Sequence, residues 1–290
     1  MKRIFIALAI LLSVQAVNAQ VKTPEAARKA VESAEAAAQN PKKNLKVATW
    51  LKLAEAYMNA YDAPAGNVIL NTPRMQLQYM LGNEKPVAVE EVIIDGQPFK
   101  KEVYSNKNLY FDGADVVRLV EVTVPVYEDP LANALQAYVK AYEVDVKKSK
   151  EKDIKAGIQN ITNRYFTDGM NEYALGDMPS AAVLLGKAAD ASETAPYSVV
   201  DTTSLYNAGY IYWASKDFET AKNYFEKCLA NNYYYENGEV YAKLGDVYFN
   251  LGDKAKGVET LETGFVKFPQ SQSILIGLIN YYLESGENTD

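Results

Sequence analysis

Small and aromatic residues recur at nearly constant spacing through the second half of the chain. The repeated turns lie at Gly176, Lys216, Gly252 and Gly286, which are 40, 36 and 34 residues apart. Around these turns the same residue types return in register: Gly169, Gly209 and Gly245; Tyr212, Tyr248 and Tyr282; Ala181, Ala221 and Gly257; Leu185, Phe225 and Leu261; and Pro269, which closes one unit. A period of this length is typical of arrays in which pairs of helices stack on one another.

The residue types at these positions explain how such helices pack. Small residues at two fixed positions let paired antiparallel helices approach closely, and the large side chains fill the space between them. Asp177, Asp217 and Asp253 follow the turns and suit the N-cap of the next helix. The repeat therefore predicts alternating first and second helices.

This constellation resembles the tetratricopeptide repeat over roughly residues 160–286. The resemblance implies an all-α fold, a helical solenoid of antiparallel helix pairs whose first helices line a concave groove. Some positions depart from the family pattern: Glu172 stands in place of a tyrosine, Lys216 in place of the turn glycine, and Gly257 and Gly264 in place of two alanines.

The same unit occurs earlier in the chain but is interrupted. Trp50, Leu53 and Tyr57 match a first helix near 44–61, yet no second helix follows directly. The second-helix pattern appears only at Ala134, Tyr138 and Ala141, after Asp129-Pro130, which suits a helix start. We therefore expect one repeat split by an insertion near 62–128, with its second helix near 130–148.

The segments around this split repeat have their own signals. Thr23-Pro24 opens an alanine-rich amphipathic pattern to about Gln39, which predicts a helix that caps the array. Inside the insertion, Thr72-Pro73 and Gly82 bound a short helix, and β-branched runs at 87–94 and 116–126 predict strands. With Asp95-Gly96 as a hairpin turn, we expect a small α+β segment with two to four strands.

The N-terminus has the pattern of a secretory signal peptide. A basic start at Lys2-Arg3 precedes an apolar run from Ile4 to Val17, and small residues precede Gln20. The run is short for a membrane span, so an uncleaved anchor is the weaker interpretation. We expect cleavage near Ala19, a periplasmic or secreted protein, and no transmembrane segment after cleavage.

These signals divide the chain into four expected parts. They are the signal peptide 1–19, the cap helix and first repeat helix 20–61, the inserted segment with short strands 62–128, and the repeat array 129–290. Whether the chain is truncated at Asp290 is left open by the sequence.

Composition excludes several classes of site. The chain has no histidine, so it cannot by itself supply a Ser-His-Asp triad, a Cys-His pair or a histidine-ligated metal. Its single cysteine, Cys228, excludes an internal disulfide and a cysteine zinc cluster, and we expect it to be buried. The net charge of −7 repels phosphate backbones and anionic membranes, so we expect no nucleic-acid partner. We expect no cofactor and no metal.

Motifs that could carry catalysis have simpler explanations. Ser149-x-x-Lys152 has the spacing of penicillin-recognising enzymes, but the supporting motifs are missing and the segment is lysine-rich. Gly252-x4-Gly257 lacks the lysine of a phosphate loop. Glu90 and Glu91 would point to opposite faces of a strand. We assign no catalytic residue. Asp201-Thr202-Thr203 is either an O-glycosylation acceptor or a helix N-cap.

The first helices of the repeats carry the residues with the strongest binding signal. Spacing of i, i+4 and i+7 places a triplet on one face of each helix. These residues are Phe166, Met170, Tyr173, Tyr206, Tyr210, Trp213, Ala242, Asp246, Phe249, Ile276, Asn280 and Leu283. Such an aromatic wall would bind an apolar peptide segment, or it would pack between neighbouring helices. Tyr233-Tyr234-Tyr235 either forms a docking edge or covers helix ends.

The function expected from this pattern is a non-enzymatic protein–protein interaction scaffold or adaptor in the bacterial cell envelope. Its partners would be other envelope proteins or peptides bound in the groove. The alternative is an envelope glycan-binding protein that uses tyrosine and tryptophan platforms, and a third class is an enzyme acting on cell-wall material. The sequence leaves open the partner, the oligomeric state and whether the groove is occupied by the chain itself.

Signal-peptide cleavage is directly testable. When the full chain is expressed in a bacterium with a secretory pathway, we expect the exported protein to begin at Gln20, because the small residues before it suit the signal peptidase. N-terminal sequencing of the exported protein checks this. A protein that keeps Met1 and stays in the membrane fraction would show that the segment is an anchor.

Overall fold

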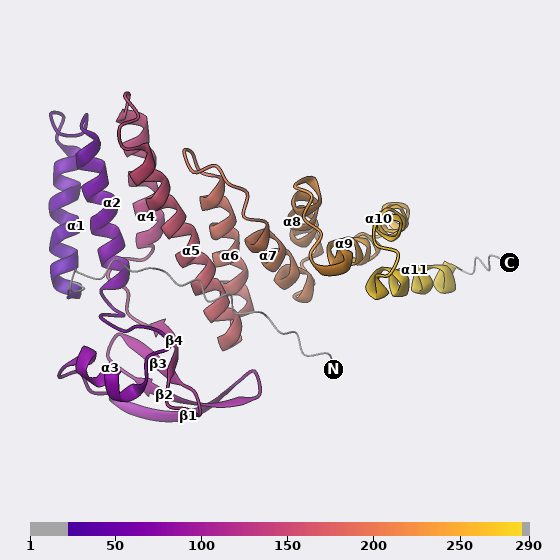
Figure 1. Cartoon of the computed structure of the whole chain (residues 1–290), viewed down its shortest axis with the longest axis horizontal. Helices are drawn as coiled ribbons and strands as arrows, with labels where there is room; N and C mark the ends of the chain where they lie inside the picture. Colours follow the sequence, from indigo (N-terminus) through magenta and orange to yellow (C-terminus); the bar gives the residue numbers. More distant parts are fainter. Residues whose placement is uncertain (1–22, 286–290) are drawn as a thin grey trace.

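A computed structural model describes residues 23–285 as a row of packed helices with a small sheet at one side (Figure 1). The helices are α1 Pro24–Gln39, α2 Val47–Asp62, α3 Arg74–Leu81, α4 Pro130–Val144, α5 Glu151–Leu175, α6 Met178–Glu193, α7 Thr202–Ala214, α8 Phe218–Ala230, α9 Glu239–Asn250, α10 Lys254–Lys267 and α11 Gln272–Ser285. The strands are β1 Ala88–Ile94, β2 Gln97–Val103, β3 Lys107–Phe111 and β4 Val117–Val122. The expected fold class, antiparallel helix pairs with a small α+β insert, is confirmed. The predicted signal peptide and the turn at Gly286 lie outside the described residues.

The turns between helices have the predicted chemistry. Asp177, Asp217 and Asp253 are N-caps whose side chains accept hydrogen bonds from backbone N–H groups in the first turn of α6, α8 and α10. Asp201 caps α7 in the same way, so the N-cap interpretation of Asp201-Thr202-Thr203 is confirmed. Lys216 takes the left-handed conformation, with φ of 64°, that glycine adopts at the corresponding turns.

The recurring glycines are sites of close helix contact. A methyl group added at Gly245 would lie 2.7 Å from the Leu261 side chain, and one at Gly169 would lie 2.8 Å from Leu185. At Gly209 it would lie 3.0 Å from Tyr224. The large residues of α6, α8 and α10 therefore sit directly on the glycines of α5, α7 and α9, as the repeat predicts.

The split repeat closes across the insertion. Helix α2 packs against α4 although 67 residues separate their facing ends in the sequence. Leu53 and Tyr57 on α2 are buried with Ala134 on α4 in one core cluster. Helix α2 begins three residues later than expected, and α4 ends at Val144 because the Asp145 carboxylate accepts the backbone N–H groups of Ser149 and Lys150 and turns the chain.

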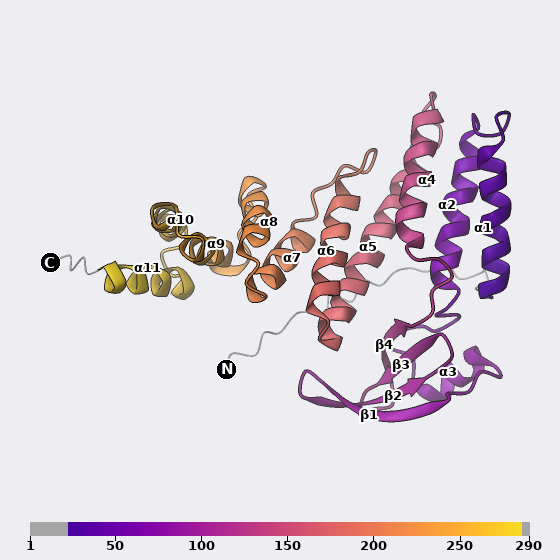
Figure 2. The same cartoon turned by 180° about the vertical axis from the view of Figure 1, so that it is seen from behind.

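The insertion is an antiparallel sheet in the order β1-β2-β3-β4, beside α3. The Asp95-Gly96 turn joins β1 to β2, with φ of 48° and 71° at its two residues, as a tight hairpin requires. One face of the sheet packs on Ala174 and Leu175 at the end of α5, and α3 covers the other face through Leu77. Figure 2 shows the sheet below α2, α4 and α5, apart from the later helices.

Cys228 is fully buried in the cluster formed by α7, α8 and α9, as predicted. Burial raises the pKa of its thiol to about 12, so the reactive thiolate is suppressed. None of the helices between residues 23 and 285 has the length and apolar composition needed to cross a membrane.

A polar network joins α2 to α5. The Tyr61 hydroxyl donates to both oxygens of Asp168, at 2.7 and 2.9 Å, and Arg164 pairs with Asp62 and lies over the Tyr61 ring. Burial raises the pKa of Asp168 to about 7, and the nearby Glu172 and Asp62 add to this effect. The charged form of Asp168 is therefore disfavoured in the folded chain.

Adding a side chain at Gly245 tests the helix contact. We expect Gly245→Val to lower the free energy of unfolding by at least about 2 kcal/mol, because the new atoms overlap the Leu261 side chain. Gly113→Val is the matched control, since nothing lies within 4 Å of a methyl group added there. Urea unfolding of both variants measures the difference, and equal midpoints would contradict the packing account.

The pH dependence of stability tests the Asp168 environment. The pKa of Asp168 in the folded chain is raised above its usual 3.8. The stability that protonated Asp168 contributes to the fold is therefore fully present below pH 3.8 and is lost as pH rises through about 7. Between pH 4 and 8 the wild type should lose up to about 4 kcal/mol of its free energy of unfolding. We expect Asp168→Asn, which keeps an acceptor for Tyr61, to show no such loss. Thermal melts across this range should be flatter for the variant. Parallel curves for wild type and variant would show that the pKa of Asp168 is not raised in the folded chain.

Candidate functional site

The aromatic triplet of α5 packs mainly within the array. Phe166, Met170 and Tyr173 are partly buried against a cluster that includes Leu185 of α6 and Ile211 of α7. The packing interpretation therefore describes much of this triplet.

On α7, Tyr206 is buried under the loop that joins α8 to α9. The ring of Tyr235 stacks on Tyr206 with centroids 4.0 Å apart, and Tyr233 meets it edge-on at 6.3 Å. Tyr234 packs instead on Tyr241 of α9 and on Phe268. The three loop tyrosines cover helix ends, so this interpretation of Tyr233-Tyr234-Tyr235 is confirmed.

Tyr210 and Trp213 remain partly exposed between α7 and α9. The Lys243 ammonium lies 3.6 Å from the centre of the Trp213 ring and 5.7 Å from that of Tyr210. The Trp213 indole N–H donates to the Asp246 carboxylate. We call Tyr210, Trp213, Lys243 and Asp246 the α7–α9 patch; it joins an aromatic wall, a cation and a carboxylate from two consecutive first helices.

The charges of the α7–α9 patch are balanced locally. Lys243 lies 3.5 Å from Glu239, one helical turn earlier on α9. Desolvation raises the pKa of the Tyr210 hydroxyl, with Glu239 among the further causes, so this hydroxyl stays neutral and able to donate a hydrogen bond. The patch can therefore present apolar ring surface and polar groups of both signs to one ligand.

Further along the array, Phe249 is turned toward its neighbours. Its ring lies 2.3 Å from the position of a methyl group added at Gly257 and stacks on Tyr281 with centroids 5.4 Å apart. Ile276, Asn280 and Leu283 on α11 are exposed, with Leu283 at 74%. Phe249 thus acts in packing, whereas the α11 residues face solvent.

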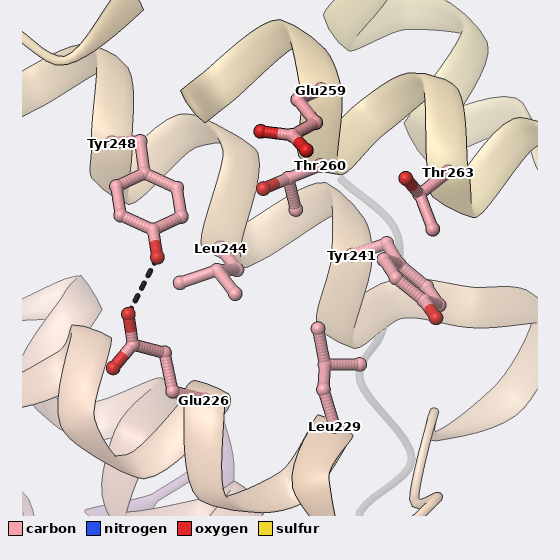
Figure 3. A pocket seen from close by; sticks show the side chains of 8 residues that line it. All are labelled: Glu226, Leu229, Tyr241, Leu244, Tyr248, Glu259, Thr260 and Thr263. Carbon is pink, nitrogen blue, oxygen red and sulfur yellow. Dashed lines mark hydrogen bonds between the residues drawn. The ribbon is translucent and has the colours of Figure 1, made fainter. Parts of the chain in front are cut away.

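A hollow on the other side of the array lies between the second helices α8 and α10 and is floored by α9 (Figure 3). Its volume is about 350 Å³, and its lining is Glu226, Leu229, Tyr241, Leu244, Tyr248, Glu259, Thr260 and Thr263. The Tyr248 hydroxyl donates to Glu226 at 2.5 Å across one end. Burial and this carboxylate raise the pKa of Tyr248.

A second hollow of about 560 Å³ has the same construction between α1 and α4, over α2. Trp50, Leu53 and Tyr57 occupy the places of Tyr241, Leu244 and Tyr248, and the Tyr57 hydroxyl donates to Glu35. The corresponding place in the array lies between α6 and α8, over α7. There Tyr224 of α8 stacks on Tyr212 of α7 and lies against Gly186 of α6, so its ring occupies this place. The repeat pattern predicts Trp50, Leu53 and Tyr57 as positions of a first helix, and in the structure they also line a hollow, which the pattern does not indicate.

The described residues offer no metal centre. Between residues 23 and 285 no group of three or more cysteine, aspartate or glutamate side chains is placed to hold an ion. Glu90 and Glu91 lie on opposite faces of β1, and Glu90 pairs with Lys101.

The tetratricopeptide repeat model matches two segments of the chain. They are residues 202–233, which contain α7 and α8, and residues 238–264, which contain α9 and most of α10. The matched segments hold the α7–α9 patch and make up less than half of the chain. No curated protein matches the chain.

Two solved structures match most of the length of this chain, both with low TM-scores. One is the Cut9–Hcn1 hetero-tetramer of APC/C, with a TM-score of 0.34 and 14% sequence identity. The match covers 90% of the present chain but only 40% of the matched chain in that structure. The other is BtubC (BKLC) from P. vanneervenii, with a TM-score of 0.27 and 13% identity over 92% of both chains.

Proposed function

We propose that this chain is a non-enzymatic interaction module of the bacterial cell envelope that binds an apolar peptide segment of another protein on the α7–α9 patch. Tetratricopeptide repeats suggest a protein–protein interaction scaffold, and two units of this repeat hold the patch. The envelope location is supported by the apolar leader at 4–17, and the partner would be another envelope protein.

The observation that carries this proposal is the fixed position of a partly exposed tryptophan. Trp213 is held by a hydrogen bond to Asp246 and by the Lys243 ammonium over its ring, both from the next repeat. A large side chain that is already ordered loses little conformational freedom when a ligand covers it. Tryptophan and tyrosine in such settings supply a large share of the binding energy at protein interfaces.

The chemistry of the patch favours a peptide as the ligand. The Tyr210 and Trp213 rings, with centroids 5.6 Å apart, offer a wall for apolar side chains. Lys243, Asp246 and the Tyr210 hydroxyl lie beside this wall and can pair with the polar backbone of an extended or helical segment.

Removal of the aromatic wall tests the proposal. We expect Tyr210→Ala combined with Trp213→Ala to weaken partner capture by more than about tenfold, because truncated aromatic anchors typically cost 2 kcal/mol or more. The measurement is a cross-linked pull-down from the native envelope fraction, quantified by mass spectrometry. Tyr79→Ala, an exposed tyrosine on α3 at 86%, is the matched control and should recover the same partners as wild type.

Two outcomes would contradict the proposal. If the folded double variant captures the same proteins at the same yield, the patch acts only in packing. In a Trp50→Phe background Trp213 is the sole tryptophan, so its fluorescence reports directly on the patch. A change of this fluorescence with oligosaccharides, and none with captured partners, would favour a glycan-binding protein.

A further inference from the structure

The sheet of the insertion has one covered edge and one open edge. The outer side of β4 is covered by the segment before α3, since Asn71 donates its backbone N–H to Val117 and Val117 donates to Thr72. The strand β1 pairs with β2 alone within residues 23–285. Figures 1 and 2 both draw β1 along the border of the sheet farthest from the long helices.

The hairpin fixes which backbone groups of β1 are free. Ile94 and Gln97 flank the two-residue turn and form the closing pair, so every second residue back from Ile94 bonds to β2. The N–H and C=O groups of Val89, Glu91 and Ile93 therefore point away from β2. Open strand edges of this kind readily accept another strand.

The side chains along this edge are apolar with an acidic centre. Val89 is 51% exposed and Ile93 is 70% exposed, and Glu91 lies between them on the same face. On the β2 side Glu91 is opposite Lys100, whereas on the open side it has no neighbouring strand within residues 23–285. If β1 of a second copy paired antiparallel with this edge and Glu91 lay at the midpoint, the two Glu91 side chains would lie opposite each other. Like charges directly opposite each other destabilise a sheet. The edge is thus disfavoured for self-pairing and suited to a strand with a basic centre.

We propose that β1 is a second interaction site, at which an extended segment of a partner protein adds as a fifth strand. The chemistry of the edge requires apolar residues opposite Val89 and Ile93 and a lysine or arginine opposite Glu91. Backbone hydrogen bonds supply most of the affinity, and the pair with Glu91 supplies selectivity. This site lies on the insertion and is separate from the α7–α9 patch.

Two labelled peptides test the site on the chain that begins at Gln20. The probe Thr-Val-Thr-Lys-Thr-Val-Thr presents a lysine to Glu91, and its counterpart carries glutamate in place of lysine. Fluorescence anisotropy should show that the lysine peptide binds several-fold tighter, and Glu91→Gln should reduce this difference. Hydrogen exchange should show new protection of the amides of Val89, Glu91 and Ile93 when the lysine peptide binds.

Glu91→Pro is the variant that removes an outward N–H without removing a bond to β2. It should abolish binding of both peptides while the circular dichroism spectrum stays that of wild type. Absence of binding to wild type, or protection at residues other than β1, overturns the proposal. A wild-type dimer that Glu91→Pro converts to a monomer would also overturn it, because the occupant would then be a second copy. If Glu91→Pro unfolds, the difference in binding between the two peptides, measured for wild type and for Glu91→Gln, still tests the proposal.

Discussion

Contact between a glycine on one helix and a large side chain on the next is the constraint on which the array depends. A side chain at Gly169 or Gly245 would overlap its neighbour and one at Gly209 would crowd Tyr224, so α5–α6, α7–α8 and α9–α10 each pack in close contact. Stacking of such similar pairs brings side chains on successive first helices close together. The α7–α9 patch is a product of this alignment, since Trp213 and its partners Lys243 and Asp246 come from different repeats.

A tyrosine–glutamate bond repeats with the helices and shows how the N-terminal part fits the array. Tyr248 donates to Glu226 and Tyr57 donates to Glu35, and 22 residues separate the partners in both pairs. Helix α1, which carries Glu35, therefore occupies the place of a second helix before α2. The insertion between α2 and α4 leaves this geometry intact and adds a sheet beside the helices. A regular array can thus carry an irregular segment without changing its own packing.

The repeat and its turns could be predicted from sequence because they depend on contacts between neighbouring segments. Asp caps and the turn at Asp95-Gly96 follow from local rules of this kind. The fate of individual aromatics could not be predicted. Tyr206 and Tyr210 are one turn apart, yet only Tyr206 is covered by Tyr235. The hollows and the Tyr61–Asp168 bond were also missed, because they join elements that are distant in the sequence.

Site-specific photo-crosslinking tests the central claim most directly. A photoreactive phenylalanine analogue at position 210 lies in the α7–α9 patch, whereas the same group at position 183 lies on α6, where Val183 is 49% exposed. The account predicts that an envelope partner is crosslinked from position 210 and not from position 183. Equal crosslinking from both positions, or crosslinking from position 183 alone, would contradict it.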